Sequence, residues 1–264
     1  MKTPVFASLI IAAALPAATA AMIYQDDFSG TAGTDLNGSI PDTRLAGEGG
    51  SSTATWTANT IIDFNGANGA ALASEGNLSR SAYLPFTPQT NFLYDYRVSM
   101  AFAEVINTTR SMQMGFFGSP PPSVTTALTT NASQGPVIFF RNNGTYVARA
   151  VGNAAPPDFN GNVPAADVVN VHTFRITIDT SQEFWVMRTY FDGVEFGNGH
   201  TFATNPTIGG VGFAVNTSGT TATNAAGTFS DFRLTATAIP EPSVLALLSI
   251  CSIFPLLRRR GKSR

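Results

Sequence analysis

FLYDYRVSMAF, residues 92 to 102, is the stretch of sequence that decides the fold. Large apolar side chains alternate here with polar ones: Tyr94, Tyr96, Val98 and Met100 at one set of positions, and Asp95, Arg97 and Ser99 at the other. Side chains of a β-strand point alternately to its two faces, so a period of two predicts a strand with one buried and one exposed face.

The same alternation recurs in short segments along the chain, and residues that favour turns separate them. It is clearest at residues 112–116, 174–178 and 211–215. Asn142-Asn143-Gly144 and Asp192-Gly193 each lie between two apolar runs and predict hairpins, because these residue types tolerate a positive φ. No helical period is sustained. About eleven to thirteen short strands predict an all-β fold, a two-sheet antiparallel sandwich or jelly roll, in which the terminal strands pair with each other.

Composition and charge exclude several classes of protein. The chain has 264 residues, of which only 12% are charged, and this composition is typical of a secreted β-protein with one main domain. Residues 22–239 contain nine Arg and no Lys against sixteen Asp and Glu, a formal charge of −7 that repels nucleic acid. They contain no cysteine, which excludes disulfides and thiolate metal sites.

The first 21 residues predict a secretory signal peptide with a short helix. A positive start precedes the apolar segment Val5–Leu15, and Pro16 and a run of small residues follow it. Cleavage after Ala20 fits best, and cleavage after Ala21 is nearly as good. The alternative is an uncleaved membrane anchor, but the apolar segment is too short to span a bilayer. We therefore expect the jelly-roll domain to occupy residues 22–237.

The C-terminal stretch, residues 238–264, has three parts. Pro240-Glu241-Pro242 forms a stiff corner, an apolar segment follows, and Arg258-Arg259-Arg260 begins a basic end. We expect a single transmembrane helix at residues 243–257. As a helix, its apolar run would be about 21 Å long, which is shorter than a bilayer core of about 30 Å. We therefore expect it to anchor the chain in the inner membrane only transiently. The basic end should stay cytoplasmic.

This tail resembles a PEP-CTERM sorting signal, whose three features it carries in order and at the terminus. The resemblance implies a bacterium with an outer membrane that produces extracellular polymer. It also implies recognition, and cleavage near Pro240, by a membrane protease of the exosortase type. The protein would then pass from the inner membrane to the cell envelope, the cell surface or the extracellular matrix.

The body of the chain resembles the concanavalin A-like (LamG-like) jelly rolls that many PEP-CTERM proteins carry. The residues that carry the resemblance are Asp26–Ser29, Ser81–Phe86, Trp185 with Asp192–Val194, Val211–Phe213 and Phe229–Leu234. This resemblance implies a fold and does not imply an activity.

Two kinds of binding site are candidates. Exposed aromatic rings can stack on the apolar faces of sugars, and we single out Trp56, Trp185 and Tyr190 for this role. The alternative for each is a position in the core, because most aromatic residues of a sandwich lie there.

A structural calcium ion is the second candidate. Asp26 and Asp27 on the first strand would lie beside Asp231 on the last strand if the terminal strands pair, and Ca²⁺ prefers oxygen ligands. The alternative is that Asp231 and Arg233 are ordinary outward-facing strand residues.

No catalytic constellation stands out. Retaining glycoside hydrolysis needs two carboxyl groups about 5 Å apart, and no Glu-x-Asp-x-x-Glu pattern occurs. Glu183, Asp192 and Glu195 are the densest acids, and Asp192 lies in a predicted turn. His172 and His200 lack a zinc-binding spacing, and we expect His172 at the surface.

The sequence thus predicts an exported, non-catalytic protein of the cell envelope or extracellular matrix, with extracellular polysaccharide as the candidate ligand. The alternative is a glycoside hydrolase-like enzyme that acts on extracellular polysaccharide through an atypical acid pair.

Overall fold

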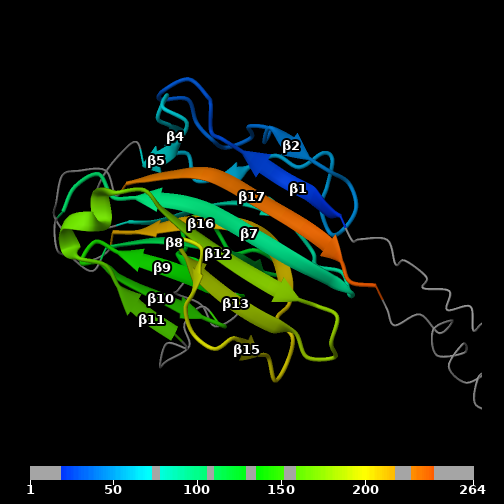
Figure 1. Ribbon diagram of the computed structural model, residues 1–264. Helices are drawn as coiled ribbons and strands as arrows, with labels where there is room; N and C mark the ends of the chain where they lie inside the picture. The colour runs from blue at the N-terminus through cyan, green and yellow to red at the C-terminus, as the bar shows by residue number, and fades with distance from the viewer. Residues whose placement is uncertain are drawn as a thin grey trace, which may run out of the picture.

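Two antiparallel sheets packed face to face form the body of the protein (Figure 1). The computed structural model describes residues 19–72, 78–105, 110–128, 135–151, 159–217 and 227–240. The ten-stranded sheet contains β1 (Ala20–Asp26), β2 (Thr43–Arg44), β4 (Ile62–Phe64), β5 (Ala70–Leu72), β7 (Phe92–Ala101), β12 (His172–Asp179), β13 (Val186–Phe191), β14 (Val194–Glu195), β15 (His200–Thr201) and β17 (Thr228–Ala238). The seven-stranded sheet contains β3 (Thr57–Ala58), β6 (Ser79–Pro85), β8 (Ser111–Gly118), β9 (Val137–Arg141), β10 (Thr145–Arg149), β11 (Phe159–Asn162) and β16 (Ile208–Asn216). A 3₁₀ helix, η2 (Ala165–Val169), precedes β12.

The order of the strands brings distant parts of the chain together. In the larger sheet it is β14-β13-β12-β7-β17-β1-β2, with β5 also on β17, β4 on β5 and β15 on β13. In the smaller sheet it is β11-β10-β9-β8-β16-β6-β3. The predicted two-sheet sandwich is confirmed.

Strand β7 has the two faces that its alternation predicts. Tyr94, Tyr96, Val98 and Met100 are all 0% exposed and belong to the core between the sheets. The hydroxyl group of Tyr96 crosses this core and donates a 2.8 Å hydrogen bond to the carbonyl oxygen of Gly212 on β16. This bond ties the two sheets to each other at their centres.

Both predicted hairpins are present. Gly144 has a φ of +88° between β9 and β10, and Asp192 and Gly193 have φ values of +47° and +81° between β13 and β14. The predicted number of strands was too low, because the described residues form seventeen. Strands of two or three residues, such as β2, β3 and β14, are too short to show a period.

The terminal strands pair with each other, as predicted. β1 lies antiparallel to β17, from Ala20 opposite Thr237 to Asp26 opposite Phe232. Both ends of the described chain therefore leave the body at the same end of the sheet (Figure 1). Both candidate cleavage positions, after Ala20 and after Ala21, fall within β1.

Most of the predicted terminal segments lie outside the described residues. This applies to residues 1–18 of the signal peptide, to Glu241 and Pro242, to the helix at 243–257 and to Arg258-Arg259-Arg260. Pro240 is described and exposed, and the amide of Ile239 before it donates to the carbonyl oxygen of Asn91 at 2.8 Å. In the part of the chain that is described, no helix is long and apolar enough to cross a membrane.

Candidate functional site

The outer face of the ten-stranded sheet carries a hollow of about 400 Å³, a volume within the range of small-ligand sites. Strands β7, β12 and β13 form its floor and walls. The lining consists of an aromatic ring, two guanidinium groups, a carboxylate, a hydroxyl group and two aliphatic side chains: Tyr190, Arg175, Arg188, Asp179, Thr177, Leu93 and Val186. The hollow thus offers both an apolar surface and hydrogen-bonding groups to one ligand.

The register of the three strands explains why a hollow forms here. Thr177 of β12 lies opposite Asp95 of β7 on one side and opposite Arg188 of β13 on the other. Arg175 and Asp179 are its neighbours on the same face of β12, since side chains two positions apart share a face. Thr177 has the shortest side chain of this group and is only 3% exposed, so it forms the floor.

Arg175 and Tyr190 form an ordered wall. The Nε and Nη2 atoms of Arg175 each lie 2.9 Å from a carboxylate oxygen of Asp95. Its guanidinium carbon lies 4.4 Å from the centroid of the Tyr190 ring, and Arg97 contacts the same Asp95 at 3.2 Å. These contacts fix the guanidinium and the ring in place without a ligand, which lowers the entropy lost on binding.

The charges around the hollow cancel. Arg188 donates a 2.7 Å hydrogen bond to Glu195, and this bond raises the pKa of the Arg188 guanidinium. Three arginines and three carboxylates thus lie at or beside the hollow: Arg97 and Arg175 share Asp95, Arg188 binds Glu195, and Asp179 is the third carboxylate. Such a set presents donors and acceptors to hydroxyl groups without attracting a net charge.

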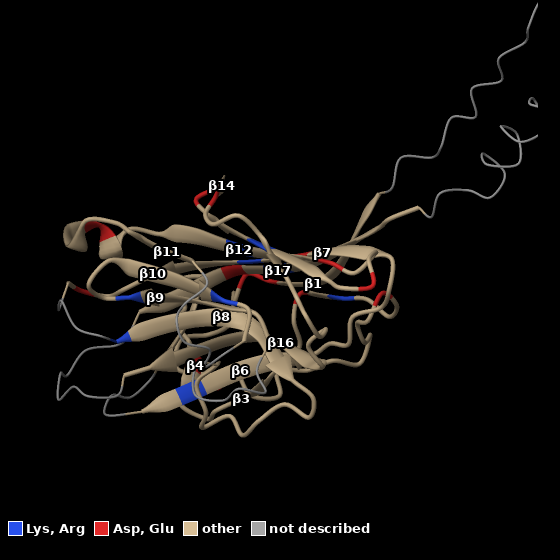
Figure 2. Ribbon diagram, turned by 90° about the horizontal axis from the view of Figure 1, so that it is seen from below, with Lys and Arg blue, Asp and Glu red and all other residues tan. Residues whose placement is uncertain are grey.

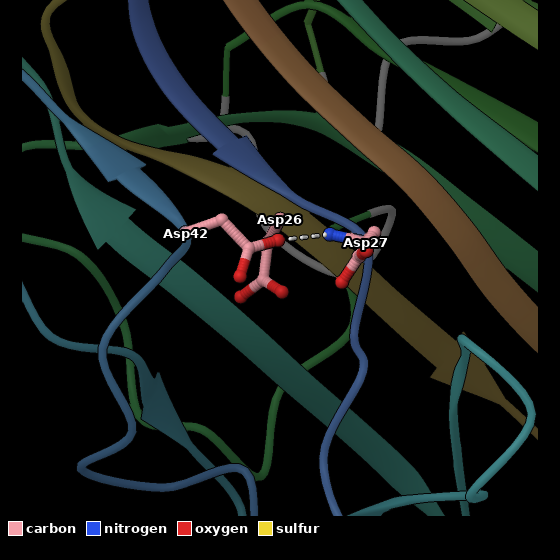
Figure 3. A group of neighbouring side chains, drawn as sticks. All are labelled: Asp26, Asp27 and Asp42. Carbon is pink, nitrogen blue, oxygen red and sulfur yellow. Dashed lines mark hydrogen bonds between the residues drawn. The ribbon is translucent and has the colours of Figure 1, made fainter.

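A cluster of three carboxylates lies where β1 ends (Figure 3). Oxygen atoms of Asp26, Asp27 and Asp42 all lie within 4.8 Å of one another. The backbone amide of Asp27 donates to Oδ2 of Asp42 at 2.8 Å, which holds the loop before β2 against the end of β1. Carboxylate oxygens are ligands that suit a hard cation such as Ca²⁺.

Asp26 is the buried member of this cluster. It is 4% exposed and accepts hydrogen bonds from the amide of Phe28 at 2.7 Å and from Nε1 of Trp56 at 2.7 Å. Burial raises the pKa of Asp26 to about 6; Asp42 and Asp27 add to this rise, and the two hydrogen bonds oppose it. A group with this pKa changes its charge over a mildly acidic range of pH.

The predicted site residues have different positions in the structure. Trp56 is 1% exposed and packs against the rings of Phe28, Phe213 and Phe232, so it does not fit a sugar-stacking role. Trp185 is partly buried and packs against the core, whereas Tyr190 lines the hollow.

The predicted calcium ligands are also divided. Asp26 and Asp27 belong to the carboxylate cluster with Asp42, whereas Asp231 has φ +52° and accepts a 2.7 Å hydrogen bond from Arg233. Pairing of the terminal strands therefore does not bring Asp231 into this cluster.

Two of the three acids considered for catalysis have partners of their own. Asp192 binds His172 and the amide of Thr173, both at 2.8 Å, and Glu195 binds Arg188. Glu183 is exposed. His172 is buried, at 8% exposed, and its Nε2 lies 3.0 Å from the carbonyl oxygen of Asp167. The expected surface position of His172 was therefore wrong, because both ring nitrogens have partners inside the fold.

The outer face of the seven-stranded sheet is partly filled. All residues of β8 are buried, although only alternate ones face the core. Leu128, from the segment after β8, packs with Phe117, Val137 and Ala214 in a second apolar cluster, and Tyr83 packs against it. The seven strands contain no Asp or Glu, so they supply no pair of acids to this face.

No protein-family model matches the chain, and no curated protein matches it. Among solved structures, the chain is similar to an endo-1,3-beta-glucanase from Streptomyces sioyaensis, with a TM-score of 0.54 and 14% identity over 86% of this chain and 100% of that chain. It is also similar to arcelin-5, a lectin-like defense protein from Phaseolus vulgaris, with a TM-score of 0.50 and 13% identity over 70% of this chain and 92% of that chain. These two likenesses show the fold.

The sequence pointed to Tyr190 but not to the other residues of the hollow. Arg175 and Thr177 are ordinary polar positions of an alternating strand, and Arg188 follows the same pattern on the next strand. Whether these side chains lie together depends on the register between β7, β12 and β13. No local sequence pattern encodes that register. Asp42 was missed because it lies in a loop and joins Asp26 and Asp27 only through the fold.

Proposed function

We propose that this chain is an exported, non-catalytic protein of the cell envelope or extracellular matrix whose jelly-roll body binds extracellular polysaccharide. The observation that carries this proposal is the hollow at Tyr190, an ordered and charge-balanced depression on an exposed sheet face. The shared fold with a lectin-like protein and with a glucanase is consistent with it.

In this proposal the Tyr190 ring supplies an apolar surface for one face of a sugar ring. Arg188, Asp179 and the hydroxyl group of Thr177 supply the surrounding donors and acceptors. The ligand is a neutral sugar unit, because each guanidinium group at the hollow already has a carboxylate partner. A volume of about 400 Å³ accommodates one or two sugar units rather than a long segment of polymer.

The terminal segments supply the rest of the proposal. The predicted signal peptide directs export, and the PEP-CTERM-like tail from Pro240 holds the chain in the inner membrane until an exosortase-type protease processes it. Mass spectrometry of surface-located protein tests this step. Loss of the residues after the Pro-Glu-Pro corner supports it, and an intact Arg264 contradicts it.

A structural Ca²⁺ belongs to the same proposal, at the cluster of Asp26, Asp27 and Asp42. Two observations support it: oxygen atoms of the three carboxylates lie close enough to bind one ion, and the pKa of Asp26 is raised, chiefly by burial and in part by Asp42 and Asp27. A bound cation would favour the charged form of these carboxylates. Such an ion would fix the end of β1 relative to the loop before β2. It takes no part in the proposed binding of sugar.

A glycan array tests the binding function. We expect the purified protein to bind neutral oligosaccharides and Tyr190→Ala to weaken this binding at least about tenfold. Phe184→Ala is the matched control, because Phe184 is exposed at 46% but does not line the hollow. Flat binding across all glycans overturns the proposal, and so does equal loss in both variants.

Turnover of polysaccharide tests the non-catalytic part. We expect no release of reducing ends from a broad panel of polymers. Release that disappears in Glu183→Gln or Glu195→Gln would instead establish the glycoside hydrolase alternative.

A further inference from the structure

His172, the first residue of β12, is a polar ring inside the fold. It is 8% exposed, and its ring centroid lies 5.7 Å from that of Phe140 on β9 and 4.9 Å from that of Phe191 on β13. Its two nitrogens reach two separate segments, the turn between β13 and β14 and the helix η2. Figure 2 shows β14 with its acidic residue standing out from the ten-stranded sheet, and the coiled ribbon of η2 at one end of that sheet.

Both nitrogens of this ring face atoms that accept hydrogen bonds. Nδ1 lies 2.8 Å from Oδ2 of Asp192, and Nε2 lies 3.0 Å from the carbonyl oxygen of Asp167. That carbonyl oxygen also accepts from the amide of Asn170 at 2.9 Å. A neutral imidazole carries one N–H and satisfies one of the two acceptors, whereas the imidazolium carries two and satisfies both. The arrangement around His172 therefore suits the doubly protonated ring.

Loss of one proton from the ring breaks one contact and weakens the other. The carboxylate of Asp192 is the stronger acceptor, so the remaining proton stays on Nδ1. Nε2 then turns a lone pair towards the carbonyl oxygen of Asp167, and this hydrogen bond to η2 is lost. The contact with Asp192 becomes a hydrogen bond from an uncharged ring, without the attraction of an ion pair. Both segments are held less firmly as a result.

The turn between β13 and β14 supports the wall of the Tyr190 hollow. Glu195 of β14 lies opposite Tyr190 of β13 and accepts the 2.7 Å hydrogen bond from Arg188. Asp192 fastens this turn to β12 with two 2.8 Å hydrogen bonds to the backbone of the strand and with its contact to His172. The position of the hairpin, and with it that of two residues lining the hollow, thus depends in part on the ring of His172.

Three other ionisable side chains lie around this ring, those of Asp192, Asp167 and Tyr146. Asp167 accepts a 3.4 Å hydrogen bond from the side-chain amide of Asn170. Burial and, to a lesser extent, the charge of Asp192 raise the pKa of Tyr146 above its ordinary value of 10.0, so its phenol stays neutral at the pH of most buffers. The ring of His172 is the group here whose residue type ordinarily changes charge between about pH 5 and 8.

We propose that His172 is a pH-sensitive clamp, which holds η2 and the β13–β14 turn in place while its ring carries two protons. Through this clamp the Tyr190 hollow binds sugar more tightly in mildly acidic than in mildly alkaline solution, a consequence that rests on the proposed function of the hollow. The reason is that a loosened wall must be ordered again when sugar binds, which lowers the affinity. His172 is a positioning residue in this scheme, since it acts on the hollow through Asp192 and Glu195.

Nitrogen-15 NMR of the imidazole rings tests the clamp on the unaltered protein without a ligand. At pH 5.5 both ring nitrogens of His172 should carry a proton, and at pH 8.5 only Nδ1. The amide resonances of Asn170 and Asp192 should shift over the same range, because the acceptor of the first and the turn of the second change. A His172 ring that is neutral at pH 5.5, or amide resonances that stay in place while it titrates, overturns the clamp.

Glycan affinity at the same two pH values tests the effect on the hollow, with the neutral oligosaccharide that binds most tightly on a glycan array as the probe. The unaltered protein should bind it at least about threefold more weakly at pH 8.5 than at pH 5.5. His172→Gln should remove this difference. His200→Gln, at the other histidine of the chain, is the matched control and should retain it, as should Asp26→Asn, whose carboxyl titrates at about pH 6 on β1.

The outcomes separate the clamp from the function of the hollow. Equal affinity of the unaltered protein at the two pH values, or a difference that persists in His172→Gln, overturns the effect on sugar binding. Absence of binding at both pH values overturns the proposed function of the hollow and that effect with it, whereas the ring NMR decides the clamp by itself.

Discussion

The indole Nε1 of Trp56 donates a 2.7 Å hydrogen bond to Oδ2 of Asp26, and both residues are buried. The ring of Trp56 fills the core between the sheets, and its one polar atom meets the buried carboxylate at the end of β1. This pair links the aromatic core to the carboxylate cluster. It makes Trp56 a structural residue, whereas burial of Asp26 raises the pKa of its carboxyl to about 6 against the opposing effect of this hydrogen bond.

Stability should fall as pH rises from about 4 to about 6 because of Asp26. The pKa of this carboxyl is about 6 in the folded protein, against 3.8 as its ordinary value, so the folded state binds more protons within that window. The stabilising contribution of Asp26 is complete below pH 3.8, the ordinary pKa, and is lost as the pH rises through about 6, the pKa in the folded protein. A difference of about two pKa units corresponds to about 3 kcal/mol in the free energy of unfolding.

Urea unfolding at a series of pH values, in EDTA, measures this effect. Asp26→Asn removes the titrating group and should flatten the curve between pH 4 and 6 relative to the unaltered protein. Parallel curves for the two proteins would show that Asp26 does not titrate in this range.

Trp56→Phe should destabilise the protein and leave its affinity for glycans unchanged. The variant keeps an aromatic ring in the core but leaves the buried carboxylate of Asp26 without its indole donor, at a cost of about 1–3 kcal/mol. Tyr190→Ala should show the reverse, with weaker glycan binding and little change in the free energy of unfolding. Denaturant unfolding and glycan affinity, measured on both variants, separate the two roles. Loss of glycan affinity in Trp56→Phe at unchanged fold would contradict this assignment.

Calcium should raise the melting temperature through the carboxylate cluster. Oxygen atoms of Asp26, Asp27 and Asp42 lie within 4.8 Å of one another, and an ion that binds only the folded state stabilises it by mass action. We expect a saturable rise in Tm on addition of CaCl₂ to protein treated with EDTA. Asp42→Asn should abolish the rise, whereas Asp231→Asn should retain it, because Asp231 pairs with Arg233 instead. A rise of equal size in Asp42→Asn would place the ion elsewhere.

Tyr96→Phe should weaken the contact between the sheets. Burial raises the pKa of Tyr96 well above its ordinary value, so its hydroxyl group stays protonated and donates to the carbonyl oxygen of Gly212. Removal of the hydroxyl group loses this buried hydrogen bond between the sheets, which costs about 1 kcal/mol in the free energy of unfolding. Tyr190→Phe, at a partly exposed position, is the control and should be close to neutral. Equal effects of the two substitutions would argue against the cross-sheet bond.

Local pattern was enough to predict the long strands and both hairpins. The alternation of residues 92–102 reports burial directly, because one face of β7 meets the core and the other meets solvent. The pairing of β1 with β17 also followed, since unpaired terminal edges would be a hazard. Strands as short as β2 and β14 could not be predicted, because two residues carry no period and their pairing depends on neighbours fixed elsewhere.

The candidate sites depend on contacts between distant segments, and the sequence does not encode these locally. Arg175 stacks on Tyr190 and binds Asp95 because β12 lies between β13 and β7, although Asp95 precedes Arg175 by 80 positions. Trp56 was a candidate for sugar stacking from the sequence but lies in the core. An aromatic residue in a Thr-rich segment resembles an exposed ligand residue until its partner Asp26, 30 positions earlier, is known.

Titration of isotope-labelled protein with neutral oligosaccharides, followed residue by residue by NMR, tests most directly whether the Tyr190 hollow binds sugar. We expect the largest shifts on Thr177, Tyr190 and the Nε–H of Arg188, around the hollow of the ten-stranded sheet. Saturable binding with shifts confined to other surfaces, or no shifts at all across a broad panel of glycans, would contradict it.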